Sequence, residues 1–474
     1  MVAERAGVPA VINTCENFIN QAHAVSALGG VPYIPVVNYP GHIDTYDLAT
    51  RETYISELVA PGIEEALTTP IEAAGAAVTV PETAVVFKGT FEEVLADYRE
   101  KMWTDGLPII PPTLEKVEEF LEYTDYPADA ILTRPLEPSY REATPWAVAV
   151  KGVMAGCRPE SMPVLIAMVK CLAEPNFRAQ DSSSTPGWET LTILNGPIIK
   201  QLGFNYEAGV MNAGFQSNTS VGRFWKMFQR NVMEIRVDAE TDKGTFGIMW
   251  PTVMAENEDF CRSVGWETHG EHRGFKPEDN VVSLMSLLGG ANYVGASQTS
   301  GENGKDFLDR ITDMHGTRGM LVTEAGTNAC RADEKAGHIV FAISPVIAQV
   351  IAKDGYSKDD MAQYIWENAK LSAEYLEGHF NQGKHCKAVE EGKLPRVFCE
   401  SEDPNRLIPV FYSPDVLHIV ATGDPGRNRC FSYMQNNVQG TMTTMKIELP
   451  KNWDALYNDS QLKKDIEKSG RRFL

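Results

Sequence analysis

The chain lacks most of the features that mark specialised protein classes. Its eight cysteines are scattered over 474 residues without a Cys-x-x-Cys pair, which is neither a zinc-site spacing nor a disulfide framework for a chain of this length. We therefore expect reduced thiols. No stretch approaches about 18 uncharged apolar residues, so no transmembrane helix is expected. The first residues do not combine a basic segment with an apolar one, so secretion is not expected either.

Positive charge is also scarce. The chain has 43 Lys and Arg against 64 Asp and Glu, for a formal net charge of -21. Nucleic acids and anionic membranes both require a basic surface, so neither is expected as a partner, and small molecules and other proteins remain. With 43% hydrophobic residues, the composition is that of an ordinary globular protein. Together with the reduced thiols, this predicts a cytoplasmic protein.

Familiar catalytic motifs are missing as well. The sequence contains no Ser-His-Asp elbow, no HExxH and no dinucleotide-binding fingerprint, and it shows no internal repeat. We therefore expect no cofactor, although a bound metal stays open.

The first 70 residues predict a βαβα fragment of a doubly wound sheet. Residues 10–14 and 31–37 have the composition of strands, and the apolar spacings after Phe18 and over 48–67 are helical. Two strands cannot bury both faces of a parallel sheet. Either later segments supply the missing strands or another polypeptide completes this domain.

The rest of the chain predicts a linker and helix over 71–104 and a larger mixed α/β domain over 105–474. Thr144-Pro145 and Ser344-Pro345 are typical helix starts. Short apolar strands are expected at 191–194, 281–288, 338–343 and 418–422. Residues 383–395 are polar and predict an exposed, irregular segment.

Two parts of the sequence resemble known proteins. The run from Gly7 through Asn38-Tyr39-Pro40-Gly41 to Thr69 resembles the C-terminal end of the selenocysteine- or cysteine-containing subunits of glycine, betaine and proline reductase, and the UGSC-motif proteins. The strings Asp105-Gly106-Leu107-Pro108, Asn195-Gly196-Pro197 and Arg273-Gly274-Phe275 resemble the large proteins that accompany UGSC-motif proteins.

The resemblance implies a hetero-oligomeric enzyme. A smaller thiol- or selenol-bearing subunit would be the partner, and the substrate would be a small molecule, with a carboxylate group expected. The implied reaction is cleavage of a carbon–heteroatom bond by cysteine or selenocysteine chemistry, and Asn195 is expected among the substrate-binding residues. Two alternatives stay open: a metal-assisted hydrolase or lyase, and a non-catalytic scaffold that stabilises a catalytic partner.

Two cysteines are candidates for the chemistry. Cys15 follows a predicted strand and precedes a helix, a position that lowers the pKa of a thiol and places it near bound ligands; the alternative is a small side chain packed at a strand end. Cys157 opens the tight junction Cys157-Arg158-Pro159-Glu160. There Arg158 is expected to bind a carboxylate and Glu160 to act as general base, or the two form a surface ion pair.

Three further segments contain possible ligand-binding residues. The loop 209–220 leads into a helix, so Asn218, Thr219 and Arg223 are expected either to bind a carboxylate or to cap that helix. Arg427 follows a predicted strand, in a loop that is either a ligand site or a tight turn.

His269 and His272 lie three residues apart with Glu271 between them and are weak metal candidates. Gly270 disfavours a helix that would orient both imidazoles together, so solvated histidines are the other interpretation.

Overall fold

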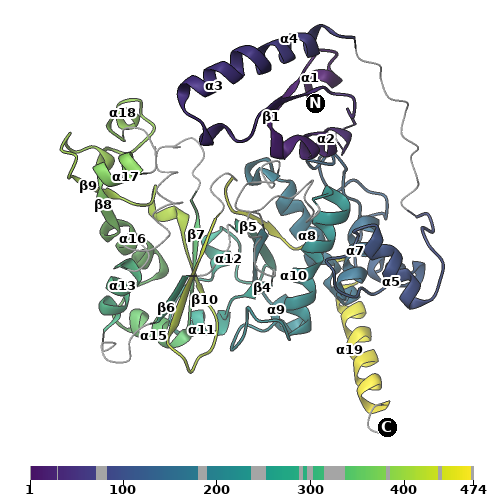
Figure 1. The fold of residues 1–474 in the computed structure, drawn as a ribbon. Coiled ribbons are helices and arrows are strands. Elements are labelled where there is room, and N and C mark those ends of the chain that lie inside the picture. The colour runs from purple at the N-terminus through teal and green to yellow at the C-terminus, as the bar shows by residue number, and fades with distance from the viewer. Residues whose placement is uncertain are drawn as a thin grey trace. The chain divides into compact units, whose positions relative to one another are not determined.

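Helices alternate with short strands along most of the chain (Figure 1), and the predicted mixed α/β fold is confirmed. The computed structural model describes residues 2–28, 30–70, 83–179, 189–235, 252–287, 292–295, 303–313, 337–379, 385–435 and 440–470. The chain divides into unit 1, formed by Met1–Pro108, Thr133–Ala143 and Met227–Lys243, and unit 2, formed by Ile109–Leu132, Thr144–Lys226 and Gly244–Leu474. Among the described residues, no helix is long and apolar enough to cross a membrane.

Unit 1 contains the predicted βαβα fragment. Strands β1 (Ile12–Cys15) and β2 (Val36–Tyr39) are parallel, with Ile12 opposite Val36. Helix α2 (Ile19–Leu28) connects them, and α3 (Leu48–Tyr54) continues through a π-helical turn into α4 (Ala60–Thr68). The predicted linker lies mostly outside the described residues. Helix α5 (Phe91–Glu100) follows it and begins with a capping box between Thr90 and Glu93.

Two later segments of the chain belong to unit 1. Ser139 Oγ donates a hydrogen bond of 2.7 Å to Val232 O, and Arg141 forms an ion pair with Glu234. Asn231 Nδ2 donates to Trp103 O at 2.9 Å. Unit 1 therefore joins residues far apart in sequence, and the predicted domain boundaries stay a prediction.

Unit 2 contains two four-stranded sheets. The β3 sheet has the order β12 (Thr443–Lys446), β5 (Val281–Leu287), β3 (Glu189–Asn195), β4 (Val253–Ala255). The β7 sheet has the order β10 (Leu417–Ala421), β7 (Ile339–Ile343), β11 (Arg429–Met434), β6 (Asn292–Gly295). The four predicted strands are β3, β5, β7 and β10; residue 288 lies outside the described residues.

The two sheets repeat one pattern of strands. In the β3 sheet, β3 pairs in parallel with β4 and antiparallel with β5, and β5 pairs antiparallel with β12. In the β7 sheet, β7 pairs in parallel with β10 and antiparallel with β11, and β11 pairs antiparallel with β6. The fourth strands are exchanged, because β6 follows β5 along the chain and β12 follows β11. The sequence analysis found no repeat, so this repeated topology is a correction.

The sheets pack face to face between two layers of helices. One core lies between them and contains Leu191 and Met285 of the β3 sheet with Val340 and Val420 of the β7 sheet. Helices α13 (Gly304–Thr312), α15 (Pro345–Lys353) and α16 (Lys358–Asn368) lie on one side of the sheets, and α8 (Met162–Ala173) and α10 (Gln216–Phe228) on the other (Figure 1). Among the described residues, the other α-helices of unit 2 outside the lobe described below are α6 (Leu114–Leu121), α7 (Pro145–Ala155), α9 (Ile198–Gln201), α11 (Glu258–Ser263), α12 (His269–His272) and α19 (Trp453–Gly470).

Local sequence signals explain where several helices begin. Helix α7 starts at Pro145, and the Thr144 side chain accepts a hydrogen bond from the Ala147 N–H, as predicted. Helix α15 starts at Pro345, also as predicted, but Ser344 Oγ accepts from the N–H of Arg429 rather than capping its own helix. Ser344 therefore connects the end of β7 to β11.

A small lobe lies between α16 and β10 in the chain. It consists of the antiparallel strands β8 (Lys370–Ser372) and β9 (Leu407–Pro409), with α17 (Ala373–His379) and α18 (His385–Glu390). Residues 383–395 were expected to be irregular, and α18 corrects that expectation over 385–390. Cys386 and Cys399 form a disulfide, so the expectation that all the thiols are reduced was also wrong.

Candidate functional site

The central residue of unit 2 is Glu256, which directly follows β4. It lies where β3, β4 and β10 end: Asn195 is the last residue of β3 and Ala421 the last of β10. The two sheets are joined here, because Asn257 N–H donates to Ala421 O and Thr422 Oγ1 donates to Ala255 O, both at 2.8 Å. Ligands of open α/β sheets gather outside the carboxyl ends of the strands, so this is the place to look for a site.

The Glu256 carboxylate is surrounded by hydrogen-bond donors. Its Oε1 accepts from Lys358 Nζ at 2.6 Å and from the Ala421 N–H at 3.2 Å. Its Oε2 accepts from Asn195 Nδ2 at 2.8 Å and from the His269 N–H at 2.6 Å. The carboxylate therefore binds elements from both sheets and two helices.

Glu256 and Lys358 form a fully buried ion pair, with side chains 0% and 3% exposed. Burial by itself raises the pKa of Glu256, but the charge of Lys358, the proximity of His269 and the hydrogen bonds from both residues together hold the pKa below its usual value. Burial likewise lowers the pKa of Lys358, but the charge of Glu256, the proximity of Cys261 and the hydrogen bonds to both together raise it. Both groups therefore stay charged at neutral pH.

The position of Lys358 is unfavourable without its partner. It is the first residue of α16, whose N-terminus is capped by the Ser357–Asp360 capping box. A cation at a helix N-terminus is repelled by the helix dipole, and a buried ammonium ion loses its hydration. Glu256 offsets both effects, so the fold keeps a fixed positive charge at this point.

Lys358 lines a cavity of about 340 Å³, which we call the histidine cavity. Three histidines also line it: His269, His272 and His418. Arg273 supplies a second cation, and the carboxylates present are Asp359 and Asp415. The remaining lining residues are Ala362, Gln363, Pro414, Leu417 and Ile419.

The His269 imidazole is held in a chain of hydrogen bonds. Its Nε2 lies 3.1 Å from Ser283 Oγ, which lies 2.9 Å from Thr444 Oγ1. Thr444 Oγ1 in turn accepts from Arg273 Nε at 3.0 Å. Burial lowers the pKa of His269 to about 3, so this ring is neutral at physiological pH.

His418 and His338 form a second imidazole pair. His338 Nδ1 lies 2.8 Å from His418 Nε2, so one nitrogen donates and the other accepts. The His418 ring also contacts the His269 ring. These two rings meet edge to face, with their centroids 5.5 Å apart. Burial, with smaller contributions from His338 and His269, lowers the pKa of His418 well below its usual value. The cavity wall therefore carries two neutral imidazoles.

His272 differs from the other two histidines because it is paired with a carboxylate. Its Nδ1 lies 3.2 Å from Asp359 Oδ1. An imidazole oriented by a carboxylate through one nitrogen is the arrangement of a general base. His272 is therefore the histidine of this cavity best placed to accept a proton.

The weak histidine motif folds differently from the prediction. Thr268 and Glu271 form a capping box, so residues 269–272 make one helical turn, α12, despite Gly270. Gly270 also permits close packing, since a Cβ there would lie 3.2 Å from Asn195 Cβ. Within the described residues, no group of three or more His, Cys, Asp and Glu side chains is arranged to hold a metal ion.

A second cavity, of about 390 Å³, lies on the other side of the ion pair, and we call it the glutamate cavity. Glu256 and Glu258 line it with Lys200, Tyr206, Arg262 and five further residues: Gly196, Pro197, Ile199, Asp259 and Pro277. Glu258 Oε1 accepts from the Gly196 N–H at 2.8 Å and from Asn195 Nδ2 at 3.1 Å. Burial raises the pKa of Glu258, while that of Glu256 is lowered.

The Asn195-Gly196 turn shapes this region. Gly196 has φ +98°, and a Cβ there would lie 2.7 Å from Asn280 Cα, so only glycine fits. Asn195, a predicted substrate-binding residue, donates to both glutamates instead. It positions these two carboxylates.

The predicted Cys157-Arg158-Glu160 site is a structural junction. Burial raises the pKa of Cys157 to about 12, with only minor opposition from Ser220 and Arg223, so no thiolate nucleophile is available near neutral pH. Arg158 binds Leu202 O and lies 3.3 Å from Ser217 Oγ. Glu160 is buried between Arg158, at 3.4 Å, and Lys464, at 2.5 Å. These contacts use both side chains within the fold, and their predicted carboxylate-binding and acid–base roles stay a prediction.

The predicted anion loop is also structural. Both ends of the Asn218 side chain are used within the fold: Oδ1 accepts from the Asn205 N–H, and Nδ2 donates to Asn205 O and Val253 O. Thr219 Oγ1 accepts from the Gly214 N–H at 3.2 Å. Arg223 lies close enough to Cys157 to influence its pKa.

Two other predicted residues are Arg427, which is not among the residues that line the two cavities, and Cys15, which belongs to unit 1. Arg427 is 80% exposed and pairs with Asp424 at 3.2 Å within its own turn, which favours the tight-turn interpretation. Cys15 is half-buried at the end of β1, directly before the 3-10 turn Glu16–Phe18 that leads into α2. Its location is the predicted one, and its role stays a prediction.

Glu256, Lys358, His338 and His418 were not predicted as site residues. Each is isolated in the sequence, and no spacing connects them. The only local signal is a buried-type strand, Val253–Ala255, followed by the polar string Glu256-Asn257-Glu258.

Comparisons of the chain with protein-family models, with curated proteins and with solved structures found no match. Function is therefore argued from the site itself.

The neutral histidines predict a specific dependence of stability on pH. In the unfolded chain these imidazoles take up protons near pH 6.5, whereas in the folded chain the lowered pKa of His269 keeps it neutral. The free energy of unfolding is therefore intact above about pH 6.5. It falls as the pH decreases toward 5, by up to about 1.4 kcal/mol per pH unit for each such histidine.

Denaturant unfolding between pH 7.5 and 5 measures this slope. His269→Gln should reduce it by about one proton, because one titrating group is removed. Ser283→Ala is the matched control: it removes the hydrogen-bond partner of His269 but no titrating group, so stability falls and the slope stays. If the pH dependence of the free energy of unfolding is unchanged in His269→Gln, His269 is not the neutral, buried imidazole described above.

Proposed function

We propose that unit 2 is the substrate-binding and acid–base part of an enzyme subunit that cleaves a carbon–heteroatom bond of a small carboxylate. The observation that carries this proposal is a small cavity lined by Lys358 and Arg273 together with the neutral imidazoles of His269 and His418. A volume of about 340 Å³ suits a small metabolite.

In this proposal, the two cations of the cavity, Lys358 and Arg273, bind the substrate carboxylate. The raised pKa of Lys358 keeps its ammonium group charged at neutral pH, as one member of the ion pair with Glu256. Arg273 is held by Thr444 Oγ1 and, at 3.2 Å, by Met442 O. Two positioned cations fix the orientation of a small anion and stabilise negative charge that develops next to its carboxylate.

In this proposal, the histidines of the cavity transfer the protons. His272 accepts a proton from the carbon next to the carboxylate, and Asp359 stabilises the resulting imidazolium. The electron pair of that C–H bond forms a double bond as the carbon–heteroatom bond breaks. The leaving heteroatom keeps its bonding pair and takes up a proton from solvent or from a neutral imidazole N–H.

The free cysteines described in unit 2 do not supply the nucleophile of this proposal. Burial raises the pKa values of Cys157, Cys171, Cys261 and Cys430, the free cysteines described in unit 2. A thiolate is the reactive form of cysteine, so these four are poor nucleophiles. The smaller thiol- or selenol-bearing subunit supplies the nucleophile or reductant in this proposal, and the assembly works in the cytoplasm.

A metal-assisted hydrolase or lyase is the alternative at the same cavity. His269, His272 and His418 are suitable ligands, but Lys358 and Arg273 repel a cation, and Asp359 is already paired with His272. Asp415 is the other carboxylate, with Ser413 Oγ 3.5 Å away. Two cations and two carboxylates line the cavity, so the binding of a carboxylate or of a metal ion decides between the two functions.

Substitutions that change the charge at Gln363 distinguish binding of a carboxylate from binding of a metal ion. Gln363 is exposed and lines the cavity, and its Nε2 donates to Glu367 at 2.7 Å. Gln363→Lys should tighten, and Gln363→Glu weaken, the binding of glycolate and thioglycolate, each by about threefold. A unit charge about 7 Å away in water contributes about 0.6 kcal/mol. Gln363→Ala controls for the lost hydrogen bond.

Calorimetric titration of each variant with these carboxylates, and separately with Zn²⁺, provides the measurement. An anion site gives tighter carboxylate binding in the order Lys, Gln, Glu at position 363. Zn²⁺ binding that strengthens in the reverse order, with no carboxylate binding to the unmodified chain, would contradict the proposal and support the metal alternative.

We place the partner subunit on unit 1. Among the described residues of unit 1, its parallel sheet consists of β1 and β2, and parallel sheets normally have more strands and are covered on both faces. Along α3 and the following π-helical turn, Leu48, Ile55 and Leu58 are 70%, 46% and 50% exposed. Open sheet edges and exposed apolar side chains at helical spacing favour a second chain at this surface.

Purification of the complex from its native host tests this placement. A smaller chain that carries an iodoacetamide-reactive thiol or selenol should co-purify with the protein. Leu48→Lys with Ile55→Lys should release it without lowering the melting temperature of the remaining chain. Leu407→Lys, at an exposed position in unit 2, is the control that should not. A monodisperse and active chain without a smaller subunit would refute the proposal.

A further inference from the structure

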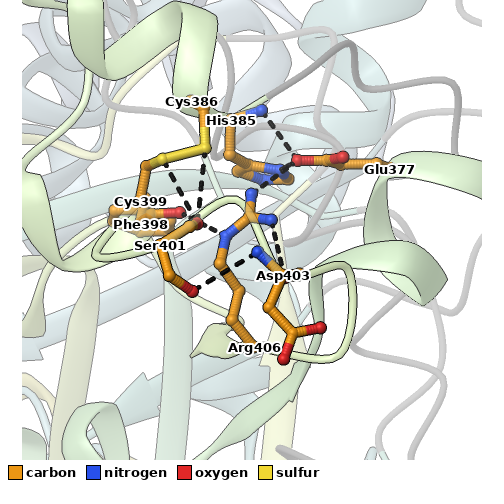
Figure 2. Close-up of a disulfide and its surroundings, with 8 residues drawn as sticks. All are labelled: Glu377, His385, Cys386, Phe398, Cys399, Ser401, Asp403 and Arg406. Carbon is orange, nitrogen blue, oxygen red and sulfur yellow. Dashed lines mark hydrogen bonds and ion pairs between the residues drawn. A yellow bond between two sulfur atoms is a disulfide. The ribbon is translucent and has the colours of Figure 1, made fainter.

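The lobe between α16 and β10 holds the disulfide between Cys386 and Cys399, which are 13 residues apart with Cα atoms separated by 4.9 Å (Figure 2). Cys386 belongs to α18, and Cys399 follows the 3-10 turn Arg396–Phe398. The other described cysteines are free: Cys15, Cys157, Cys171, Cys261 and Cys430. This pair is therefore distinguished by its oxidation state.

The two half-cystines are brought together by contacts that do not involve sulfur. The residues that precede them, His385 and Phe398, stack with parallel rings whose centroids are 5.9 Å apart. Both side chains are buried. Because one ring comes from α18 and the other from the turn before Cys399, the stack holds the two segments next to each other whether or not the sulfurs are bonded.

A charged network holds the same two segments from a second direction. Glu377 Oε1 accepts from the His385 N–H at 3.0 Å and lies 3.2 Å from His385 Nδ1. Arg406 donates to Glu377 at 2.9 Å and, through Nε, to Phe398 O at 3.4 Å (Figure 2). The Glu377–Arg406 pair therefore connects the start of α18 to the turn before Cys399.

The sulfur atoms are more accessible than those of the buried cysteines. Cys386 and Cys399 are both half-buried, whereas the four free cysteines described in unit 2 are buried. Both sulfurs lie beside Ser401 O, at 3.8 and 3.5 Å. Thiol–disulfide exchange requires that an attacking thiolate reach one of the two sulfurs, and partial exposure of both residues favours such access at this pair over the buried cysteines.

We propose that Cys386 and Cys399 form a reversible dithiol–disulfide couple that exchanges electrons with an external dithiol. One thiolate of the dithiol attacks a sulfur of the pair, the S–S bond breaks, and the released thiolate takes up a proton. The second thiol of the dithiol then displaces the mixed disulfide. The lobe gains two electrons and two protons, and the external dithiol becomes a disulfide.

This couple is independent of the acid–base chemistry proposed for the histidine cavity. Its physical basis is pre-organisation: the His385–Phe398 stack and the Glu377–Arg406 pair keep the two thiols close after reduction. A high effective concentration of one thiol at the other favours rapid closure of the disulfide.

Equilibration of the full-length protein in dithiothreitol buffers of graded redox ratio tests the proposal. Free thiols are trapped by alkylation and quantified by mass spectrometry. Cys386 and Cys399 should open and close together, reversibly and without denaturant, while the circular dichroism spectrum is retained. A bond that resists excess dithiothreitol until the protein unfolds, or a lobe that melts irreversibly on reduction, would overturn the proposal.

Two variants test the role of the holding contacts. Arg406→Ala should slow re-formation of the disulfide several-fold, because the turn before Cys399 loses an anchor. Arg427→Ala removes an exposed arginine from another turn of the same unit and should leave the rate unchanged. Equal rates in the two variants would show that the contacts do not pre-organise the thiols.

Cys399→Ser tests whether an external thiol can reach the pair. It should leave Cys386 as a stable mixed disulfide with glutathione, and failure to form this mixed disulfide would contradict the predicted access.

Discussion

The buried ion pair between Glu256 and Lys358 is the interaction on which the organisation of unit 2 depends. A carboxylate with no exposed surface is tolerated only when its charge and lone pairs are matched, and Glu256 meets this condition with donors from β3, β10, α12 and α16. Each of these elements also lines, or lies directly beside, one of the two cavities. The same carboxylate thus fixes the geometry of both.

The repeated strand topology explains why the site lies where it does. Each sheet contributes one parallel pair, β3 with β4 and β7 with β10, and the carboxyl ends of these pairs meet at Glu256 and Thr422. Exchange of the fourth strands, β6 and β12, ties the two halves together. Lys358 and His418 come from the half built on the β7 sheet, and Asn195 and Glu256 from the half built on the β3 sheet. Neither half alone contains the complete arrangement.

Local features of the fold could be predicted from the sequence, whereas the site could not. Thr144-Pro145 and the apolar run at Leu191 encode a helix start and a strand through neighbouring residues, and both predictions were confirmed. The site depends on contacts between residues such as Glu256 and Lys358, which are 102 positions apart. Cys157 shows the converse: its tight, polar neighbourhood in sequence suggested chemistry, but the thiol is buried, with Ser220 and Arg223 of α10 nearby, and this is a tertiary effect.

The central claim is that Glu256 and Lys358 form one energetic unit, and a double-mutant cycle measures it most directly. Denaturant unfolding of Glu256→Gln, of Lys358→Met and of the double variant gives the coupling energy. Each single change should cost about 3–5 kcal/mol because it leaves a buried charge unpaired, and the double variant should cost far less than the sum. The exposed pair Lys387–Glu391, treated in the same way, should couple by less than about 1 kcal/mol. Additive costs at Glu256 and Lys358, or single costs as small as those of the exposed pair, would contradict the claim.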